Sequence, residues 1–229
     1  MSKTIIVAGF GPGSSAAVAE KFGRAGFAVA LVARRADSLN AGVKALEAKG
    51  VRAAAFQADL SDPEAIRAMV ANVRSTLGPI TVLQWTAANY GAGDLLTADA
   101  ATVRGVLDVA VIGLLTAVQE TLPDLRKEKD AAVLVTNGGL AYFDPKVEAM
   151  AVQFGAMGLS IANSAKHKLV GLLAAKLKPD NVYVGEVIIS GSVKGTVFDN
   201  GQATIEGTTV ADKFWDLYSA RGEVFAQVS

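Results

Sequence analysis

Short apolar runs alternate along this chain with longer segments in which apolar residues recur every three or four positions. The short runs are rich in alanine, valine and isoleucine, as in buried strands, and the longer segments have the period of amphipathic helices. The pattern predicts strands at residues 4–8, 28–33, 52–57, 81–85, 131–136, 182–189 and 223–228. It predicts helices at residues 14–25, 38–49, 63–77, 100–122, 153–177 and 210–220. Repeated strand–helix units of this kind indicate an α/β fold: a doubly wound parallel sheet of six to seven strands with helices on both faces.

Helix-end signals support this division of the chain. Asp62 precedes Pro63, which combines an N-cap carboxylate with proline at the first helical position. Gly26 and Gly78 fall where helices are expected to stop before the next strand. No linker or low-complexity tract interrupts the alternation, so residues 1–229 are expected to form one domain.

Composition excludes several classes of protein. The 22 basic residues balance 22 acidic ones, so neither nucleic acid nor an anionic membrane surface is an expected partner. The chain has no cysteine and a single histidine, His167, so disulfides are excluded and a metal site is not expected. The N-terminal apolar run is too short for a signal peptide, and no stretch approaches the ~20 apolar residues of a membrane span. A cytoplasmic protein is expected.

A glycine-rich turn follows the first predicted strand. Gly9, Gly11 and Gly13 separate residues 4–8 from the helix that is expected to begin at Ser14. Such a turn brings the backbone close to a pyrophosphate, and the helix N-terminus adds free N–H groups and the positive end of its dipole. The position of the turn, between a strand and a helix, indicates a dinucleotide-binding site.

Two arginines end the second predicted strand. An acidic residue about 20 positions after the glycine turn is typical of NAD-binding folds, but this chain has Arg34 and Arg35 there. Guanidinium groups bind a 2′-phosphate through paired, charge-assisted hydrogen bonds. The pair therefore favours NADP(H), although two arginines on a solvated loop would also satisfy the pattern.

With these motifs, the chain resembles the short-chain dehydrogenase/reductase superfamily over essentially its whole length. Gly9 and Gly13 match the first two glycines of the family motif, Ser15 replaces the third, and Asp59-Leu60 matches the pair that contacts adenine. The resemblance implies a single Rossmann-type domain with NADP(H) as cofactor. The implied cofactor-binding residues are Gly9, Gly11, Gly13, Ser14, Arg34, Arg35, Asp59, Leu60, Ala87, Lys166, Gly191 and Val193.

The family's catalytic tetrad is degenerate in this chain. Its asparagine, serine and tyrosine positions align with Ala110, Gly139 and Ala162, and only the lysine is kept, as Lys166. In the family, this lysine binds the nicotinamide ribose and lowers the pKa of the tyrosine four residues before it. The Asn-Asn-Ala-Gly motif after the fourth strand is likewise replaced, by Trp85-Thr86-Ala87-Ala88.

Without this tyrosine, another polar residue would have to supply the proton. Tyr142, after the fifth predicted strand, is the preferred candidate beside Lys166, because ligands sit at the carboxyl ends of such strands. Asn89 and Tyr90 are weaker candidates. His167, and to differing degrees Asn163 and Ser164, are expected to face away from the site.

Two main functions remain open. One is an NADP(H)-dependent oxidoreductase that acts on a small carbonyl or alcohol substrate through an altered proton path. The other is a non-catalytic NADP(H)-binding protein, such as a redox sensor or a partner subunit of an active relative; a scaffold that binds no nucleotide is a poorer third.

By resemblance to the family, residues 100–122 and 153–177 are expected to form a homodimer or homotetramer interface. Residues 192–207 and the helix after them are expected to cover the pocket with Val197, Phe198, Trp215 and Tyr218.

Overall fold

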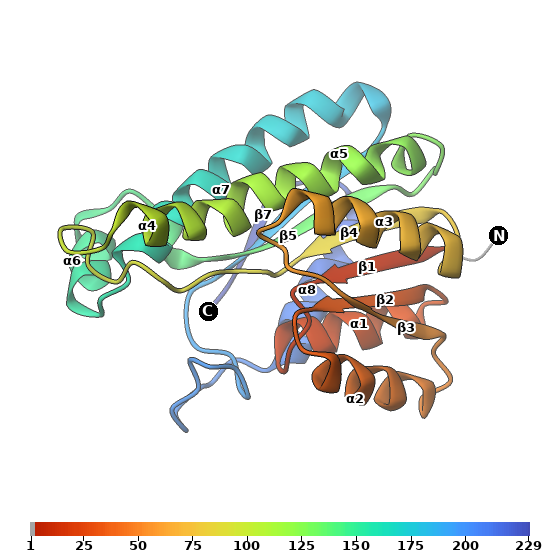
Figure 1. The fold of residues 1–229 in the computed structure, drawn as a ribbon, viewed down its shortest axis with the longest axis horizontal. Helices are drawn as coiled ribbons and strands as arrows, with labels where there is room; N and C mark the ends of the chain where they lie inside the picture. The colour runs from red at the N-terminus through yellow and green to blue at the C-terminus, as the bar shows by residue number, and fades with distance from the viewer. Residues whose placement is uncertain (1–2) are drawn as a thin grey trace.

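The computed structural model describes residues 3–229, which contain one seven-stranded parallel sheet in the order β3-β2-β1-β4-β5-β6-β7 (Figure 1). This arrangement confirms the predicted doubly wound α/β fold. The strands are β1 (Thr4–Ala8), β2 (Ala28–Ala33), β3 (Ala53–Gln57), β4 (Ile80–Trp85), β5 (Ala132–Gly138), β6 (Tyr183–Ile189) and β7 (Phe225–Val228).

Helices connect the strands on both sides of the sheet. They are α1 (Ser14–Arg24), α2 (Ala36–Glu47), α3 (Pro63–Leu77), α4 (Ala100–Leu107), α5 (Leu114–Leu125), α6 (Pro145–Gln153), α7 (Met157–Leu177) and α8 (Gly207–Ala220). A π-helical segment, η1 (Asp108–Gly113), joins α4 to α5, and two short 3-10 helices are η2 (Gly139–Ala141) and η3 (Lys178–Asp180). Such π-helical segments are frequent at functional sites.

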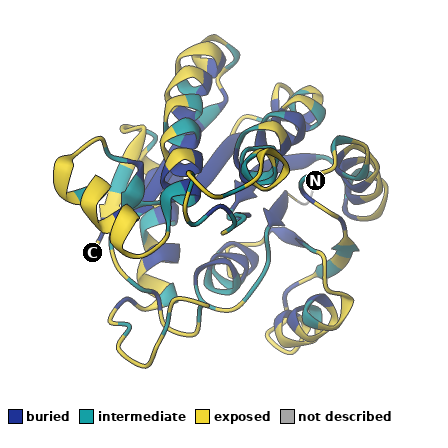
Figure 2. Ribbon diagram, turned by 60° about the vertical axis from the view of Figure 1, so that its left-hand side comes forward, coloured by how far each residue is buried: buried dark blue, intermediate teal, exposed yellow. Residues whose placement is uncertain are grey.

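Each face of the sheet has its own apolar core. On one face α3, α5 and α7 bury residues such as Ile66, Leu114 and Val170, and on the other α1, α2 and α8 bury residues such as Phe22 and Phe214. The two helix layers lie on opposite sides of the strands in Figure 1, and Figure 2 shows the central strands as buried, whereas the edge strands β3 and β7 are partly exposed. Side chains that are buried on both faces explain the near-continuous apolar runs of the strands.

The main difference from the predicted elements is an additional helix before α7. The helix predicted at residues 153–177 begins at Met157, and α6 ends at Gln153. Asp144 caps α6 by accepting a hydrogen bond from the Lys146 N–H group, and Gly155, with φ 58°, breaks the chain between the two helices. Asp144 followed by Pro145 is a helix-start signal that is present in the sequence.

The expectation that no apolar stretch approaches a membrane span in length was wrong. The continuous helical run Ala100–Leu125 has a mean hydropathy of 1.8 and is long enough to cross a membrane by length and composition alone. However, Leu114, Ala117 and Leu125 from this run are buried in the core beside α3. This packing accounts for the apolar character of that face of the helix.

The order of strands reverses between β1 and β4. The chain winds outward through β2 and β3, then returns to the other side of β1 with β4 and continues to β7. The loops that follow β1 and β4 therefore diverge and leave a crevice at the carboxyl ends of the strands. Ligands bind at such a switch point in open parallel sheets.

Candidate functional site

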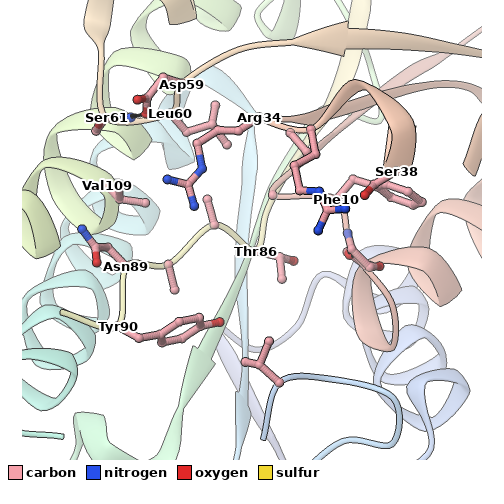
Figure 3. Close-up of a pocket in the computed structure, with 18 of the residues that line it drawn as sticks. Phe10, Arg34, Ser38, Asp59, Leu60, Ser61, Thr86, Asn89, Tyr90 and Val109 are labelled. Atoms are coloured by element: carbon pink, nitrogen blue, oxygen red, sulfur yellow. Dashed lines mark hydrogen bonds between the residues drawn. The ribbon is translucent and has the colours of Figure 1, made fainter. Parts of the chain in front are cut away.

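The crevice forms a cleft of about 630 Å³. It is lined by the loops that follow β1, β2, β3 and β4, and by residues of η1 and of the loop before α8 (Figure 3). The predicted residues that line it are Gly9, Gly11, Ser14, Arg34, Arg35, Asp59, Leu60 and Ala87.

The glycine turn is packed tightly against the loop after β4. Gly9 has φ 89°, and a Cβ atom there would lie 2.4 Å from the backbone nitrogen of Ala87. Ser15, at the position of the family's third glycine, closes the turn: its hydroxyl accepts a hydrogen bond from the Gly11 N–H group and donates one to the Gly11 carbonyl, each at 2.9 Å. The loss of the third glycine therefore leaves the turn intact.

Gly13 is the one predicted cofactor residue that lines neither cavity described here. Its φ is 82°, and a Cβ atom would lie 2.6 Å from the methyl group of Thr196 and 3.1 Å from the Lys194 carbonyl oxygen. The glycine lets the loop between β6 and α8 close over the turn. Thr196 and Val197 from that loop reach the cleft, as expected for a covering segment.

Arg34 and Arg35 form a basic end of the cleft. Neither arginine forms an ion pair within residues 3–229, and the guanidinium group of Arg34 points into the cleft in Figure 3. The Gln57 side chain donates a hydrogen bond to the Arg34 carbonyl oxygen and holds this backbone in place. Ser38, on the first turns of α2, lines the same end. Two uncompensated cations and a hydroxyl group suit a phosphate monoester.

Another wall of the cleft is largely apolar. Leu60 and Val109 line it, with Asp59 at its edge. Asp59 accepts hydrogen bonds from the backbone N–H and the hydroxyl group of Ser61. The backbone bond, and after it the hydroxyl bond, lowers the pKa of Asp59, and the positive charge of Arg34 adds a smaller effect in the same direction. Asp59 therefore stays ionised.

A smaller cavity of about 160 Å³ continues from this cleft. Both are lined by Ser14, Thr86, Ala88, Tyr90 and Thr196, so they form one connected hollow. Lys166 reaches the smaller cavity from α7, and Gly191 and Val193 reach it from the loop after β6.

Lys166 is the charged group of this cavity and is only 2% exposed. Burial lowers its pKa from 10.5 to about 8, and the negative charge of Glu186 partly opposes that shift. A lysine with this pKa is present in both its protonated and its neutral form near pH 8, whereas an ordinary surface lysine stays protonated there.

Polar side chains bridge β4 and β5 beside the cavity. The amide group of Gln84 donates hydrogen bonds to the hydroxyl groups of Thr86 and Thr136, and the two hydroxyl oxygens are 2.9 Å apart. Thr86 and Thr136 both line the cavity. This network takes the place of the family's paired asparagines at the end of the fourth strand.

Two of the degenerate tetrad positions pack against each other. Ala110 in η1 and Ala162 in α7 are each 2% exposed and belong to one apolar cluster with Val106. This cluster fills the region from which the family's asparagine and tyrosine side chains would extend. Neither position supplies a polar group to the cavity.

Gly139, which aligns with the family's serine, does not line either cavity. Gly138 lines the cavity. A Cβ atom on Gly139 would instead lie 2.7 Å from the hydroxyl oxygen of Ser190, which accepts a hydrogen bond from Gln227 on β7. The position that faces the cavity is therefore Gly138, and no hydroxyl group extends from either glycine.

Tyr142, the preferred replacement donor, is not among the residues that line either cavity. The 3-10 turn η2 redirects the chain after β5, and the Tyr142 ring lies edge-on to His167, with ring centroids 6.1 Å apart. His167 in turn bonds the buried carboxylate of Glu186 on β6. His167 thus faces away from the cavity as expected, and Tyr142 lies beside it rather than beside Lys166.

Tyr90 stands at the mouth where the two cavities meet. Its ring is 53% exposed and packs edge-on against Phe198, with centroids 5.0 Å apart. Figure 3 shows the ring lying across the lower part of the cleft. The two aromatic side chains therefore form a partial cover over the smaller cavity, contributed from both sides of the crevice.

Asn163 is the cavity residue that sequence reasoning placed wrongly. It was expected to face away in part, but it lines the smaller cavity together with Leu159 and Lys166. The spacing of these three positions, four and then three residues, places them on one side of a helix. That periodicity was available in the sequence, and the alignment on the tyrosine position obscured it.

Comparison with known proteins agrees with this architecture. The short chain dehydrogenase family matches residues 3–203, so the chain belongs to this family. A short chain dehydrogenase from Pseudocercospora fijiensis is 28% identical over 184 residues, which are 79% of this chain and 60% of that protein. The chain thus spans about 60% of the length of that curated relative.

Solved structures with the same fold are more distant in sequence. A short chain dehydrogenase from Burkholderia cenocepacia in complex with NADP has a TM-score of 0.86 at 23% identity, covering 100% of this chain and 97% of its own. An NADPH-bound short chain oxidoreductase from Pseudomonas aeruginosa, described as containing an atypical catalytic center, has a TM-score of 0.86 at 21% identity, with 99% and 95% covered. At these identities the likeness shows the fold alone.

Proposed function

We propose that the protein is an NADP(H)-dependent oxidoreductase that acts on a small carbonyl or alcohol substrate through an altered proton path. The observation that carries the proposal is the connected hollow itself. It joins the glycine turn, the basic end at Arg34 and Arg35, and the buried Lys166. Each part has the chemistry that suits one portion of a dinucleotide: the arginines suit the 2′-phosphate, the glycine turn the pyrophosphate, and Lys166 the nicotinamide ribose.

The residues fit NADP(H) part by part. The pyrophosphate would lie on the glycine turn at the N-terminus of α1, where a side chain on Gly9 would collide with Ala87. The 2′-phosphate would lie between Arg34 and Arg35. Adenine would rest on the apolar wall, and Lys166 would hold the nicotinamide ribose. Relatives of the same fold that are solved with NADP or NADPH support this reading.

Lys166 is the preferred proton source in this scheme. NADPH, if bound there, would supply a hydride to the carbonyl carbon of the substrate. The ammonium group of Lys166 gives a proton to the carbonyl oxygen and is then neutral until solvent restores the proton. Its lowered pKa makes both forms accessible near neutral pH. Tyr142 has no role in this mechanism, because it lies beside His167 and lines neither cavity.

A turnover assay separates this function from its rival. The protein is mixed with NADPH and a panel of small aldehydes and ketones, and NADPH oxidation is followed by its absorbance. Consumption of NADPH that depends on the carbonyl compound, and that Lys166→Met reduces by about 10²-fold or more, is the expected result for loss of a general acid. NADPH binding without turnover of any panel member would count against an enzyme.

The second candidate is a non-catalytic NADP(H)-binding protein. The packed cluster of Val106, Ala110 and Ala162 favours it, because two former catalytic positions have become part of an apolar core. This candidate requires the same cleft and the same affinity for NADPH. It differs only in predicting no turnover.

We also propose a cellular location and an oligomeric state for the protein. A cytoplasmic protein is proposed, supported by the packing of the apolar run Ala100–Leu125 on the core. A homodimer or homotetramer is proposed through residues 100–122 and 153–177, supported by the exposed Ile161 and Leu172 on α7. Light scattering on the purified protein would reveal a monomer if the latter proposal were wrong.

A further inference from the structure

Asn163 is a buried polar residue for which the family resemblance offers no function. It sits on α7 between Leu159 and Lys166 and is 4% exposed. Its backbone carbonyl oxygen accepts a hydrogen bond from the Asn137 side chain at 3.0 Å. Asn137 also bonds Glu186 on β6, so this part of the helix is fixed to the sheet.

The side-chain amide of Asn163 is unpartnered. Among the residues that the structure describes, no hydrogen bond reaches its amide oxygen or leaves its amide nitrogen, although the side chain is almost fully enclosed and lines the cavity. Its amide atoms are not among the fully enclosed, unpartnered polar atoms of the described residues, so solvent in the cavity can reach them. A ligand that enters the cavity can replace that solvent and bond to the amide.

Gly138 provides the space that this amide occupies. A Cβ atom at Gly138 would lie only 2.9 Å from the amide nitrogen of Asn163. Any larger residue at the end of β5 would therefore displace the Asn163 side chain. The amide stands where a side chain from this strand end would otherwise enter the cavity.

We propose that Asn163 binds the carbonyl oxygen of the substrate, with its amide group in the place of the missing strand-end hydroxyl. This assignment rests on the proposed function and identifies a substrate-binding residue within it. The same group would bind the hydroxyl oxygen of an alcohol in the reverse direction. The ligand class is a small neutral compound with one hydrogen-bond-accepting oxygen, because the cavity of about 160 Å³ would also have to hold the nicotinamide end of the cofactor.

The assignment divides the chemistry between two neighbouring residues. As the carbon–oxygen π bond opens, its electron pair moves onto the oxygen, and the N–H groups of Asn163 stabilise the growing negative charge. Lys166 then gives the proton that completes the alcohol. Asn163 transfers no proton, so its role is separable from that of Lys166.

Binding of an unreactive carbonyl compound tests the assignment without turnover. Isobutyramide accepts a hydrogen bond at its carbonyl oxygen and is not reduced, so its affinity for the NADPH-loaded protein can be measured by calorimetry. Asn163→Leu keeps nearly the same volume and removes the amide, and Asn163→Ala is a second variant. Each is expected to weaken isobutyramide binding about fivefold to tenfold, the effect of losing one hydrogen bond of about 1.4 kcal/mol or less.

The NADPH dissociation constant of each variant is expected to stay within about twofold of the wild-type value. Asn72→Ala, an exposed residue of α3, serves as the control and is expected to change neither constant. Equal isobutyramide binding by wild type and Asn163→Leu would overturn the assignment. Failure of the NADPH-loaded wild type to bind isobutyramide would overturn it as well.

A double-mutant cycle gives a sharper test of the steric relation. Gly138→Ser alone is expected to weaken isobutyramide binding, because its Cβ atom displaces the Asn163 amide. Gly138→Ser combined with Asn163→Ala removes the collision and places a hydroxyl group at the strand end, so binding is expected to recover above either single variant. If the losses in isobutyramide affinity of the two single variants simply add up in the double variant, the residues at positions 138 and 163 do not compete for the same space, and the assignment is contradicted. Loss of NADPH binding by wild type would instead refute the proposed function, and the assignment with it.

Discussion

At the scale of single residues, the site is defined by charged and polar groups that lack partners. Arg34 and Arg35 form no ion pair in the described chain, Lys166 is buried with its charge, and the Asn163 amide is unbonded. Arg34 and Arg35 are exposed, so it is their position at one end of the cleft that suits an anionic ligand. Lys166 differs from them, because its burial disfavours the charged form.

The burial of Lys166 has a measurable effect on stability. Between pH 8 and 10.5 the unfolded chain keeps a proton on this lysine that the folded chain has lost, so the free energy of unfolding rises with pH across this window. The rise is about 3 kcal/mol for a shift of this size. Lys166→Met is expected to remove it, as measured by urea unfolding at several pH values. Parallel pH profiles for wild type and variant would show that Lys166 titrates normally.

At the scale of elements, the helices were predicted well where their ends carried capping signals and less well elsewhere. The Asp62 cap was confirmed by its bond to the Glu64 N–H group. The break at Gly155 was missed, because apolar residues continue across it and periodicity alone does not register a change of helix axis. The π-helical segment η1 was also missed, since its extra residue per turn leaves no separate mark in the apolar pattern.

The same difficulty affected the catalytic positions. A sequence alignment matches a residue to a position in the family motif, but the direction of its side chain depends on the local backbone conformation. Gly139 begins η2 and Tyr142 directly follows it, so the turn of the chain at η2 takes both residues away from the cavity. The cofactor half could be predicted more completely, because its residues lie at strand ends whose direction the sheet determines.

The packing of Ala162 yields a prediction for the element that carries it. Restoring the family's tyrosine with Ala162→Tyr would force a large ring into the cluster of Ala110 and Val106. Overpacking of this kind typically costs about 1–3 kcal/mol. The variant is therefore expected to melt several degrees below wild type and to gain no activity. An unchanged melting temperature, or restored turnover, would show that the tyrosine position is still open to the cavity.

At the scale of the whole molecule, the function follows from where the sheet reverses its order. Because β1 and β4 are neighbours, the glycine turn, the two arginines and the cavity of Lys166 meet at the carboxyl ends of the strands. The sequence predicted this meeting through the alternation of strands and helices. It could not predict which side chains close the nicotinamide end, because those come from three loops and from α7, and their approach is a property of tertiary packing.

The central claim is that this hollow binds NADP(H), and a calorimetric titration with NADPH and with NADH tests it most directly. Wild type is expected to bind NADPH with a micromolar dissociation constant and NADH at least tenfold more weakly. The double variant Arg34→Ala with Arg35→Ala is expected to lose about 10- to 100-fold in NADPH affinity, the worth of charge-assisted hydrogen bonds to one phosphate, with little change for NADH. Equal binding of the two cofactors, or binding of neither, would contradict the account.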